Sequence, residues 1–232
     1  NGGEGAPLSP LFHQLIVSQN KINLPICILN IGGISNMTII KEPIGSKQIY
    51  SKDIGPGNCL IDDWVRNNCN QKFDEDGKLA STGKINQIIF EQAQDLFINR
   101  NNKEKLSFDI SDFDVSFSRG LSLEDGAATL TELTANIIGE SLSFILGKEN
   151  LIKKILVCGG GRKNKILLKK SSKYLSPKIS FKLIDEYGVD GDFVESQAFA
   201  FLAIRSYKKL PLSFPSTTNC KTPSLGGELA EN

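Results

Sequence analysis

The chain has 232 residues, a formal net charge of +1 at pH 7, 40% hydrophobic residues and 23% charged residues. This composition is typical of a globular protein, and the length allows one large domain or two small ones. The small net charge gives no electrostatic reason to expect binding to nucleic acid or to an anionic membrane. We also find no apolar run that is long enough for a membrane-spanning helix, and no signal peptide.

The cysteines and the histidine restrict the chemistry further. The five cysteines are widely spaced and form no Cys-x-x-Cys pair, so we expect reduced thiols in a cytoplasmic protein. His13 is the single histidine, which argues against a histidine-based catalyst or metal cluster. We expect it in a loop or on the surface of a helix. No metal ligand is assigned from the sequence.

Apolar residues recur with helical and strand periods that alternate along the chain. The expected elements, in chain order, are helix 7–17, hairpin 26–40, strand 47–52, helix 60–68, helix 84–99, helix 123–146, strand 155–158, helix 165–173, strand 179–184 and helix 192–208. Residues 74–83 are the most linker-like interruption, and 108–121 is irregular. This order predicts an α/β fold with a mixed sheet covered by helices.

Two of these helices carry an apolar face that we expect to be buried. On helix 84–99 this face consists of Ile85, Ile88, Ile89, Ala93 and Leu96. On helix 123–146 it consists of Leu130, Leu133, Ile137, Ile138, Leu142 and Ile145.

The segment Asp53-Ile54-Gly55-Pro56-Gly57-Asn58 is the first candidate site. An acid at a strand end, two glycines and a helix start can offer one carboxylate and several backbone amides to a ligand, since glycine permits close approach and a helix N-terminus attracts anions. These residue types are equally compatible with a tight turn that Asn58 caps.

Two further glycine clusters accompany this segment. Asn30-Ile31-Gly32-Gly33 lies at the tip of the expected hairpin, and Cys158-Gly159-Gly160-Gly161 follows a buried strand. Each cluster alone is also explained as a turn or as packing glycines. Together and in this order they favour the fold of actin, Hsp70 and the sugar kinases, in which the first cluster faces phosphates and the second faces adenosine.

Over nearly its whole length the chain resembles the anhydro-N-acetylmuramic acid kinase family. The motifs that carry the resemblance are Gly3–Leu8 with Phe12-His13, Asn30–Asn36, Asp53–Asn58, Ala127–Ala135, Cys158–Gly161 and Glu195–Ala203. The resemblance implies a ribonuclease H-like fold, mostly its second lobe. Residues 1–25 would end the first lobe with a loop and helix, 26–210 would form the second actin-like lobe, and 211–232 would be a C-terminal tail.

The resemblance also implies ATP, Mg²⁺ and the substrate 1,6-anhydro-N-acetylmuramic acid, which the family converts with water to N-acetylmuramic acid 6-phosphate in peptidoglycan recycling. It assigns Asp53 as the general base and Glu195 as a sugar-binding carboxylate. Phosphate binding maps to Asn30, Gly32, Gly33, Gly55, Gly57 and Asn58. Adenosine binding maps to Gly159, Gly160, Gly161 and Asn164.

Some assignments keep an alternative. Glu195 could simply complement the dipole at the start of a helix. Asp62 and Asp63 could approach Mg²⁺ through water or stabilise the first turn of their helix. The resemblance also implies a homodimer for the full-length protein.

The chain departs from the family at several places. We find no Gly-Thr-Ser-type glycine loop, which belongs to the N-terminal half of the phosphate clamp, so we expect this chain to be the C-terminal part of the kinase. Segment 105–119 lacks the Pro-Pro-Lys-Ser-Thr-Gly-Arg run, and Asn219 stands where glycine is usual. On its own the chain is expected not to phosphorylate the sugar at a useful rate, and to self-associate through an exposed apolar patch.

Three functions therefore stay open. The first is a sugar kinase, the second is a non-catalytic remnant that binds nucleotide or sugar weakly, and the third is an actin/Hsp70-like ATPase module. Segments 53–58 and 195–203 match the sugar kinases and count against the third.

Overall fold

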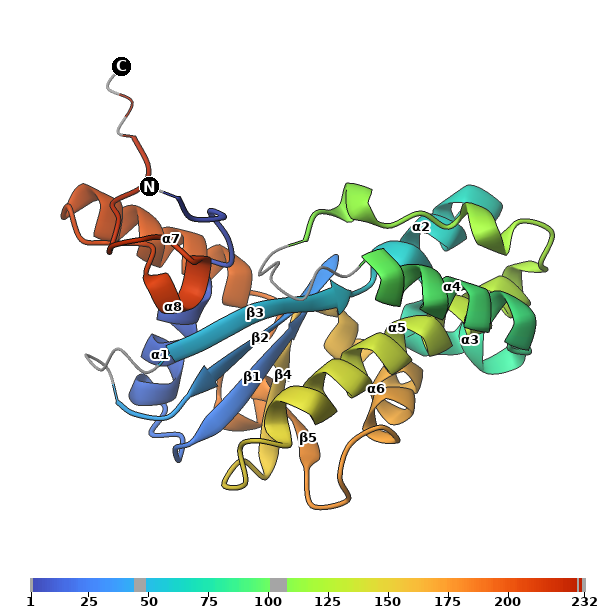
Figure 1. Cartoon of the computed structure of the whole chain (residues 1–232), viewed down its shortest axis with the longest axis horizontal. Helices are drawn as coiled ribbons and strands as arrows, with labels where there is room; N and C mark the ends of the chain where they lie inside the picture. The colour runs from blue at the N-terminus through green and yellow to red at the C-terminus, as the bar shows by residue number, and fades with distance from the viewer. Residues whose placement is uncertain (1, 44–48, 101–107, 229, 231–232) are drawn as a thin grey trace.

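The computed structural model describes residues 2–43, 49–100, 108–228 and 230. Its centre is a five-stranded sheet in the order β3-β2-β1-β4-β5 (Figure 1). The strands are β1 Ile26–Ile31, β2 Ile34–Ile40, β3 Ile49–Pro56, β4 Lys154–Cys158 and β5 Ser180–Leu183. β1 and β2 pair antiparallel, as do β2 and β3, whereas β4 is parallel to both β1 and β5. This mixed sheet, covered by helices, confirms the expected fold class.

The hairpin is confirmed, with Gly32 and Gly33 between β1 and β2. Strand β3 is longer than expected, because it continues to Pro56 and therefore contains Asp53. Residues 47 and 48 of the expected strand lie outside the described residues. The pairing of β2 with β3 shifts where Ile54 is the extra residue, which is a β-bulge. Asp, Gly and Pro are common in turns, so the sequence predicted a loop after Asp53. In the structure β3 continues through the bulge to Pro56.

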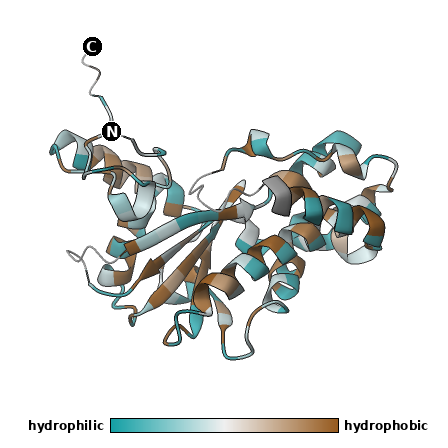
Figure 2. Ribbon diagram, in the orientation of Figure 1, coloured by the Kyte–Doolittle hydropathy of each residue, from teal (hydrophilic) through white to brown (hydrophobic). Residues whose placement is uncertain are grey.

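Different helices cover the two faces of the sheet. Helices α5 (Leu123–Leu146) and α6 (Lys165–Ser172) pack on one face, and α1 (Pro10–Gln19) and α7 (Val194–Tyr207) pack on the other. Neighbouring strand residues alternate between these cores, since Leu29 faces α5 and Ile28 faces α1. Figure 2 shows the central strands β1 and β4 as mostly hydrophobic.

A third group of helices packs against the first half of α5, beyond the sheet (Figure 1). It consists of α2 Cys59–Asn68, α3 Lys78–Thr82 and α4 Gln87–Arg100. Trp64 of α2 donates its indole N–H to the carbonyl of Leu123 at 2.9 Å. The core of this group includes Trp64, Ala80, Phe90 and Leu130.

Residues 74–83 are not the linker that the sequence suggested. Asp74 is buried, and its carboxylate accepts the backbone N–H groups of Leu79 and Ala80 at 2.8 and 3.0 Å. These bonds satisfy free amides at the start of α3. The buried Asp74 therefore caps a helix, while Glu75, Asp76, Lys78, Ser81 and Thr82 are exposed.

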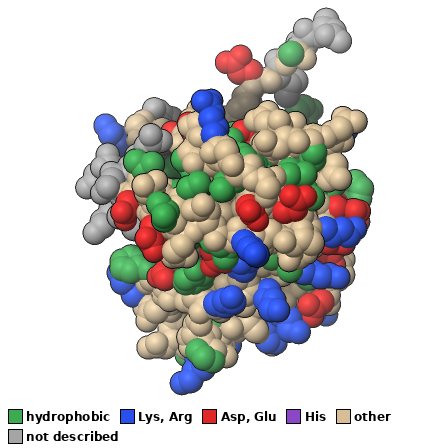
Figure 3. Space-filling model, turned by 90° about the vertical axis from the view of Figure 1, so that its right-hand side faces the viewer, with side chains coloured by type: hydrophobic (Ala, Val, Ile, Leu, Met, Phe, Trp, Pro, Cys, Tyr) green, Lys and Arg blue, Asp and Glu red, His purple; other side chains and the backbone are tan. Residues whose placement is uncertain are grey.

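The expected apolar face is confirmed for α5 and only in part for α4, where Ala93 is buried and Ile89 is half-buried. On α5, Ile145 is half-buried and the other five residues of the expected stripe are buried. On the α4 segment, Ile85, Ile88 and Leu96 are 38%, 69% and 49% exposed, whereas Phe90 and Ala93 face α5. Figure 3 shows hydrophobic side chains on this end of the molecule, among acidic and polar ones. The spacing of apolar residues predicts that a helix has an apolar face, but it does not tell which of those residues are covered by a neighbouring element.

His13 is a core residue, contrary to the surface or loop position expected. It is 1% exposed, and its Nδ1 lies 2.8 Å from Thr38 Oγ1. Burial lowers the pKa of His13 from 6.5 to about 4. The cause is its place on α1 beside Phe12 and Ile16, on the side that packs against the sheet.

The remaining segments are short. Helix α8 covers Pro215–Thr218, and 3-10 turns cover Glu75–Gly77, Ile110–Asp112, Ser116–Ser118, Gly160–Lys163 and Ile184–Tyr187. Asn219 has φ = 57°, so asparagine takes the left-handed conformation that glycine favours. The Glu4 N–H donates to the Thr218 carbonyl at 2.8 Å, which joins the two ends of the chain. No helix in the described ranges is long and apolar enough to cross a membrane.

Candidate active site

The three glycine clusters meet at one edge of the sheet. Strands β1, β3 and β4 point in the same direction, so the residues that follow them lie at the same edge. The Asn58 N–H donates to the Gly32 carbonyl at 2.7 Å, and a Cβ built on Gly161 would lie 3.0 Å from Asn58 Oδ1. Ligands of open α/β sheets commonly bind beyond the carboxyl ends of the strands. This edge, called here the glycine edge, is therefore the candidate ligand site.

Part of the glycine edge is occupied by bonds within the chain. The N–H of Gly57 donates to the Gly33 carbonyl at 2.8 Å, and the Asn58 N–H is already paired. A Cβ on Gly57 would lie 2.2 Å from the Gly32 carbonyl oxygen, and one on Gly55 would lie 2.4 Å from Ile137 Cγ2. Packing therefore explains Gly55 and Gly57, and the amides of Gly57 and Asn58 are engaged rather than directed at a ligand.

The three glycines after β4 differ from one another. Gly159 has φ = +79°, and a Cβ there would lie 2.4 Å from Asn30 Oδ1. A Cβ on Gly161 would lie 2.2 Å from Ile31 Cγ2, whereas the nearest atom to one on Gly160 is Asn58 Nδ2 at 3.8 Å. Gly159 and Gly161 are thus required by the fold, and Gly160 faces open space.

Asn164 has a structural role in this region. Its side-chain Oδ1 accepts the N–H of Leu167 at 3.0 Å, which caps the start of α6. The residue is buried. A side-chain N-cap is by itself a sufficient reason for asparagine at this position, so the predicted contact with adenosine has a structural alternative.

Asp53 lies on β3, buried and held in place. It pairs with Asn36 of β2, and one carboxylate oxygen accepts the N–H of Phe108 at 2.8 Å. Only 5% of Asp53 is exposed. The rings of Phe97 and Phe113 pack against that of Phe108 with centroids 6.3 and 5.7 Å away. An oriented carboxylate of this kind can take a proton from a water or a hydroxyl group.

Glu195 is exposed and lies in the first turn of α7. Burial mainly raises the pKa of the Cys158 thiol to about 12, and the Glu195 charge contributes to the rise, so α7 begins near the end of β4. Asp62 lies in the first turn of α2, where burial raises its pKa to about 6. Asp63 is half-buried on the same helix.

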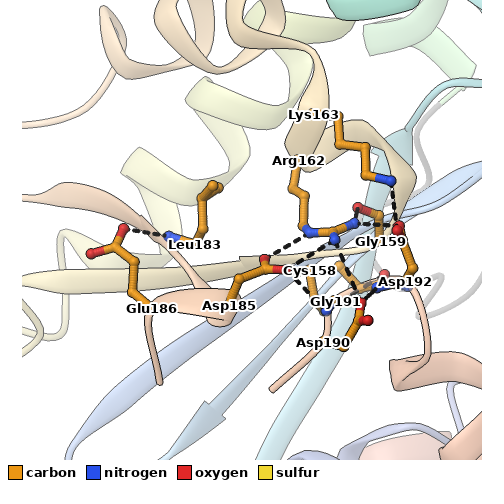
Figure 4. A network of polar contacts seen from close by, with 11 residues as sticks. Cys158, Gly159, Arg162, Lys163, Leu183, Asp185, Glu186, Asp190, Gly191 and Asp192 are labelled. Atoms are coloured by element: carbon orange, nitrogen blue, oxygen red, sulfur yellow. Dashed lines mark hydrogen bonds and ion pairs between the residues drawn. The ribbon is translucent and has the colours of Figure 1, made fainter. Parts of the chain in front are cut away.

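Arg162 was missed by the sequence reasoning. It follows the three glycines and is buried, with a bidentate pair to Asp185 and a further bond to Asp192 (Figure 4). These carboxylates raise the pKa of Arg162 above its ordinary value. Arginine is usually exposed, so the only signal in the sequence was the group of acids Asp185, Asp190 and Asp192 before α7.

Comparisons of the sequence with a family model and with curated proteins agree on one family. The family model described as anhydro-N-acetylmuramic acid kinase matches residues 1–231. The protein of that name from Pelagibacter ubique (strain HTCC1062) is 54% identical over 233 residues, which cover 100% of this chain and 62% of the relative. The one from Zymomonas mobilis is 38% identical over 230 residues and covers 98% of this chain and 60% of its own.

The chain therefore spans about three fifths of the length of these relatives. Among solved structures, the activator of the 2-hydroxyisocaproyl-CoA dehydratase from Clostridium difficile with bound ADPNP aligns with a TM-score of 0.48 at 13% identity. That alignment covers 87% of this chain and 68% of the activator. A likeness this remote supports no argument about ligands.

Proposed function

The chain belongs to the anhydro-N-acetylmuramic acid kinase family, and from this premise we propose that it supplies the catalytic base of an ATP-dependent kinase. The reaction converts 1,6-anhydro-N-acetylmuramic acid and water to N-acetylmuramic acid 6-phosphate, in peptidoglycan recycling in the cytoplasm. The observation that carries the proposal is the buried, oriented carboxylate of Asp53 on the strand that leads to the glycine edge. The homodimer expected for the full-length protein stays a prediction.

In the proposed reaction, Asp53 takes a proton from a water whose oxygen bonds to the anomeric carbon. The bond from that carbon to O6 breaks and opens the anhydro bridge. The freed O6 then bonds to the γ-phosphorus of ATP, ADP leaves, and the proton on Asp53 passes to solvent. The Phe108 N–H holds the carboxylate in one orientation, and Glu195 would bind a sugar hydroxyl. Correct orientation of the reacting groups is a large part of such catalysis.

The nucleotide would lie at the glycine edge, with adenosine near Gly160 and the phosphates near Asn30, Gly32 and Gly33. The open space at Gly160 supports this placement. Among the described residues, no group of three or more His, Cys, Asp or Glu side chains could hold a metal ion. Mg²⁺ that accompanies a nucleotide is commonly held by phosphates, waters and one or two carboxylates. A nucleotide-bound Mg²⁺ at the glycine edge would therefore not require a group of three protein ligands.

The test of the base uses a chimera in which this chain replaces the matching part of the Pelagibacter ubique relative. We expect ADP release that depends on the anhydro sugar. Asp53→Asn should lower it by about 100-fold or more, the usual effect of losing a general base, because the amide can still accept the Phe108 N–H but cannot take a proton. Asp95→Asn, an exposed change on α4, is the matched control and should leave the rate unchanged.

The nucleotide side is tested by Gly160→Val in the same chimera. The side chain would extend into open space, so the fold should persist while calorimetry shows weaker ATP binding and unchanged sugar affinity. Gly161→Ala is the contrasting variant, because its Cβ would contact Ile31 and should lower stability instead.

If Asp53→Asn keeps activity within a factor of a few, Asp53 is not the base. A chimera that binds nucleotide without turnover would favour the non-catalytic binding role.

A further inference from the structure

Arg162 connects the glycine edge to the loop that leads into α7 (Figure 4). Its side chain is 5% exposed. Nη1 donates to the carbonyl of Gly159 at 3.2 Å and to Asp192 Oδ1 at 2.7 Å. A single nitrogen therefore contacts both the first glycine of the turn and the residue two positions before α7.

The loop before α7 is built around the guanidinium group. Nε and Nη2 donate to the two oxygens of Asp185 at 2.8 and 3.0 Å. A Cβ on Gly191 would lie 2.3 Å from Nε, so the loop backbone packs closely against the side chain. Bidentate pairs between arginine and a carboxylate fix the geometry of both partners. Arg162 thus sets the path of the loop from Asp185 to Asp192.

The start of α7 depends on this loop. Phe193 occupies the N-cap position and makes no side-chain capping bond. Its backbone N–H donates instead to the Asp190 carbonyl at 3.1 Å. Glu195 follows three residues after Asp192, in the first turn. The position of the first turn therefore depends on the backbone of the loop that contains Asp190 and Asp192, and not on a side-chain cap.

We propose that Arg162 is a positioning residue that transmits occupancy of the glycine edge to Glu195. The inference rests on the proposed function, which places nucleotide at Gly160 and sugar at Glu195. A ligand against Gly160 shifts the peptide that carries the Gly159 carbonyl, Nη1 follows its acceptor, and the shift reaches Asp192. Such coupling between two sites is reciprocal, so sugar at Glu195 also changes the affinity for nucleotide.

The link stays charged at neutral pH. Hydrogen bonds from Arg162 and Lys163 lower the pKa of Asp192 to about 2. Lys163 contacts the other oxygen of Asp192 from the exposed side and makes no bond to the Gly159 carbonyl. Both residues lie in the 3-10 turn Gly160–Lys163 and both bond to Asp192. They differ in one respect that an experiment can use, since of these two side chains it is Arg162 that also bonds to the Gly159 carbonyl.

The experiment is a titration of the chimera described above, ¹⁵N-labelled in the part that this chain supplies, with Mg²⁺ and the ATP analogue ADPNP, followed by amide chemical shifts. In the wild type we expect shifts at Gly159–Gly161 and also at residues 193–197. In Asp192→Asn the shifts at the glycines should persist and those at 193–197 should fall by at least half. Arg162→Lys should behave likewise, because lysine keeps the positive charge but lacks the several N–H donors by which the guanidinium group contacts Asp185, Asp192 and Gly159 at once. Lys163→Met is the matched control and should retain both sets.

The outcomes separate the two proposals. Equal shifts at residues 193–197 in wild type and Asp192→Asn would overturn the positioning role alone. So would a wild type that responds at the glycines and not at α7. A wild type that shows no response at Gly159–Gly161 would overturn the nucleotide site and the positioning role together. Asp192 is 44% exposed, so the amide variant should fold even if Arg162→Lys does not.

Discussion

The two faces of the sheet are covered in different ways. On the α5 face, the core is a continuous apolar cluster that includes Leu29, Met37 and Ile138, all fully buried. On the α1 and α7 face, His13, Thr38 and Ser51 form a buried polar chain, with Thr38 Oγ1 at 2.8 Å from His13 and 3.4 Å from Ser51. Thr38 belongs to β2, Ser51 to β3 and His13 to α1, so strands and helix both contribute to the polar character of this face.

The two long helices show the same contrast. Helix α5 buries residues around most of its circumference, because the sheet, α2, α4 and α6 surround it. Helix α7 buries only Val194, Ala198 and Leu202, and its outward face carries Phe199 and Ile204 at 62% and 55% exposure. Burial follows the neighbours that a helix has, and not its own hydrophobicity alone. The α5 face should therefore dominate stability.

Ile138→Ala should give the largest effect. The side chain is fully buried at the centre of the α5 face, and its removal leaves a cavity that costs about 2–5 kcal/mol. The same change at Ile204 on α7 should alter stability by less than about 0.5 kcal/mol. Urea unfolding of both variants measures the difference. Equal losses would show that the outward face of α7 is covered in solution.

The contribution of His13, on the α1 face, to the free energy of unfolding should fall at acid pH. The pKa of His13 is about 4 in the fold and 6.5 without burial, so the unfolded chain binds more protons between these values and stability falls as pH drops below 6.5. The contribution of His13 to this loss between about pH 7.5 and pH 5 should be about 2 kcal/mol. The raised pKa of Asp62 acts in the opposite direction over the same range, so the measurement is the difference between two proteins. Urea unfolding at both pH values should show that the change in stability of the wild type and that of His13→Gln differ by this amount. Parallel pH profiles would remove His13 as the cause.

Phe199→Ser should have the smallest effect on stability, within about 0.5 kcal/mol, because the ring is 62% exposed. It should nevertheless reduce self-association of the chain, since Phe199, Ile204 and Tyr207 form an exposed apolar surface on α7. Sedimentation equilibrium compares it with Gln197→Ser, a polar exposed change on the same helix. If both variants associate as the wild type does, α7 is not the surface involved.

The fold class could be predicted from the sequence, and so could the proximity of the three glycine clusters. Strand and helix periods are local, and the α5 range 123–146 is confirmed at both ends. The expectations for residues 74–83 and for His13 were wrong because polar residues were taken as exposed. Asp74 is buried and bonds to amides of the following helix α3, and His13 is buried against Thr38 of β2.

Arg162 was missed for a related reason. Its carboxylate acceptors are more than twenty residues away, and no local pattern shows which acid an arginine meets. The roles of Asp53, Gly160 and Glu195 rest on the family resemblance and stay predictions.

The joint between the sheet and α2 is made of main-chain atoms. Carbonyls of Gly32 and Gly33 accept the amides of Gly57, Asn58 and Cys59. Such a joint depends on the path of the backbone and not on the identity of most side chains. The attachment of α2 to the sheet therefore requires Gly57, whereas the packing of α2 against α5 requires its buried apolar side chains. In a library randomised at positions 57 to 61 and selected for folding, we expect glycine at 57, apolar residues at the buried positions 59, 60 and 61, and varied residues at 58.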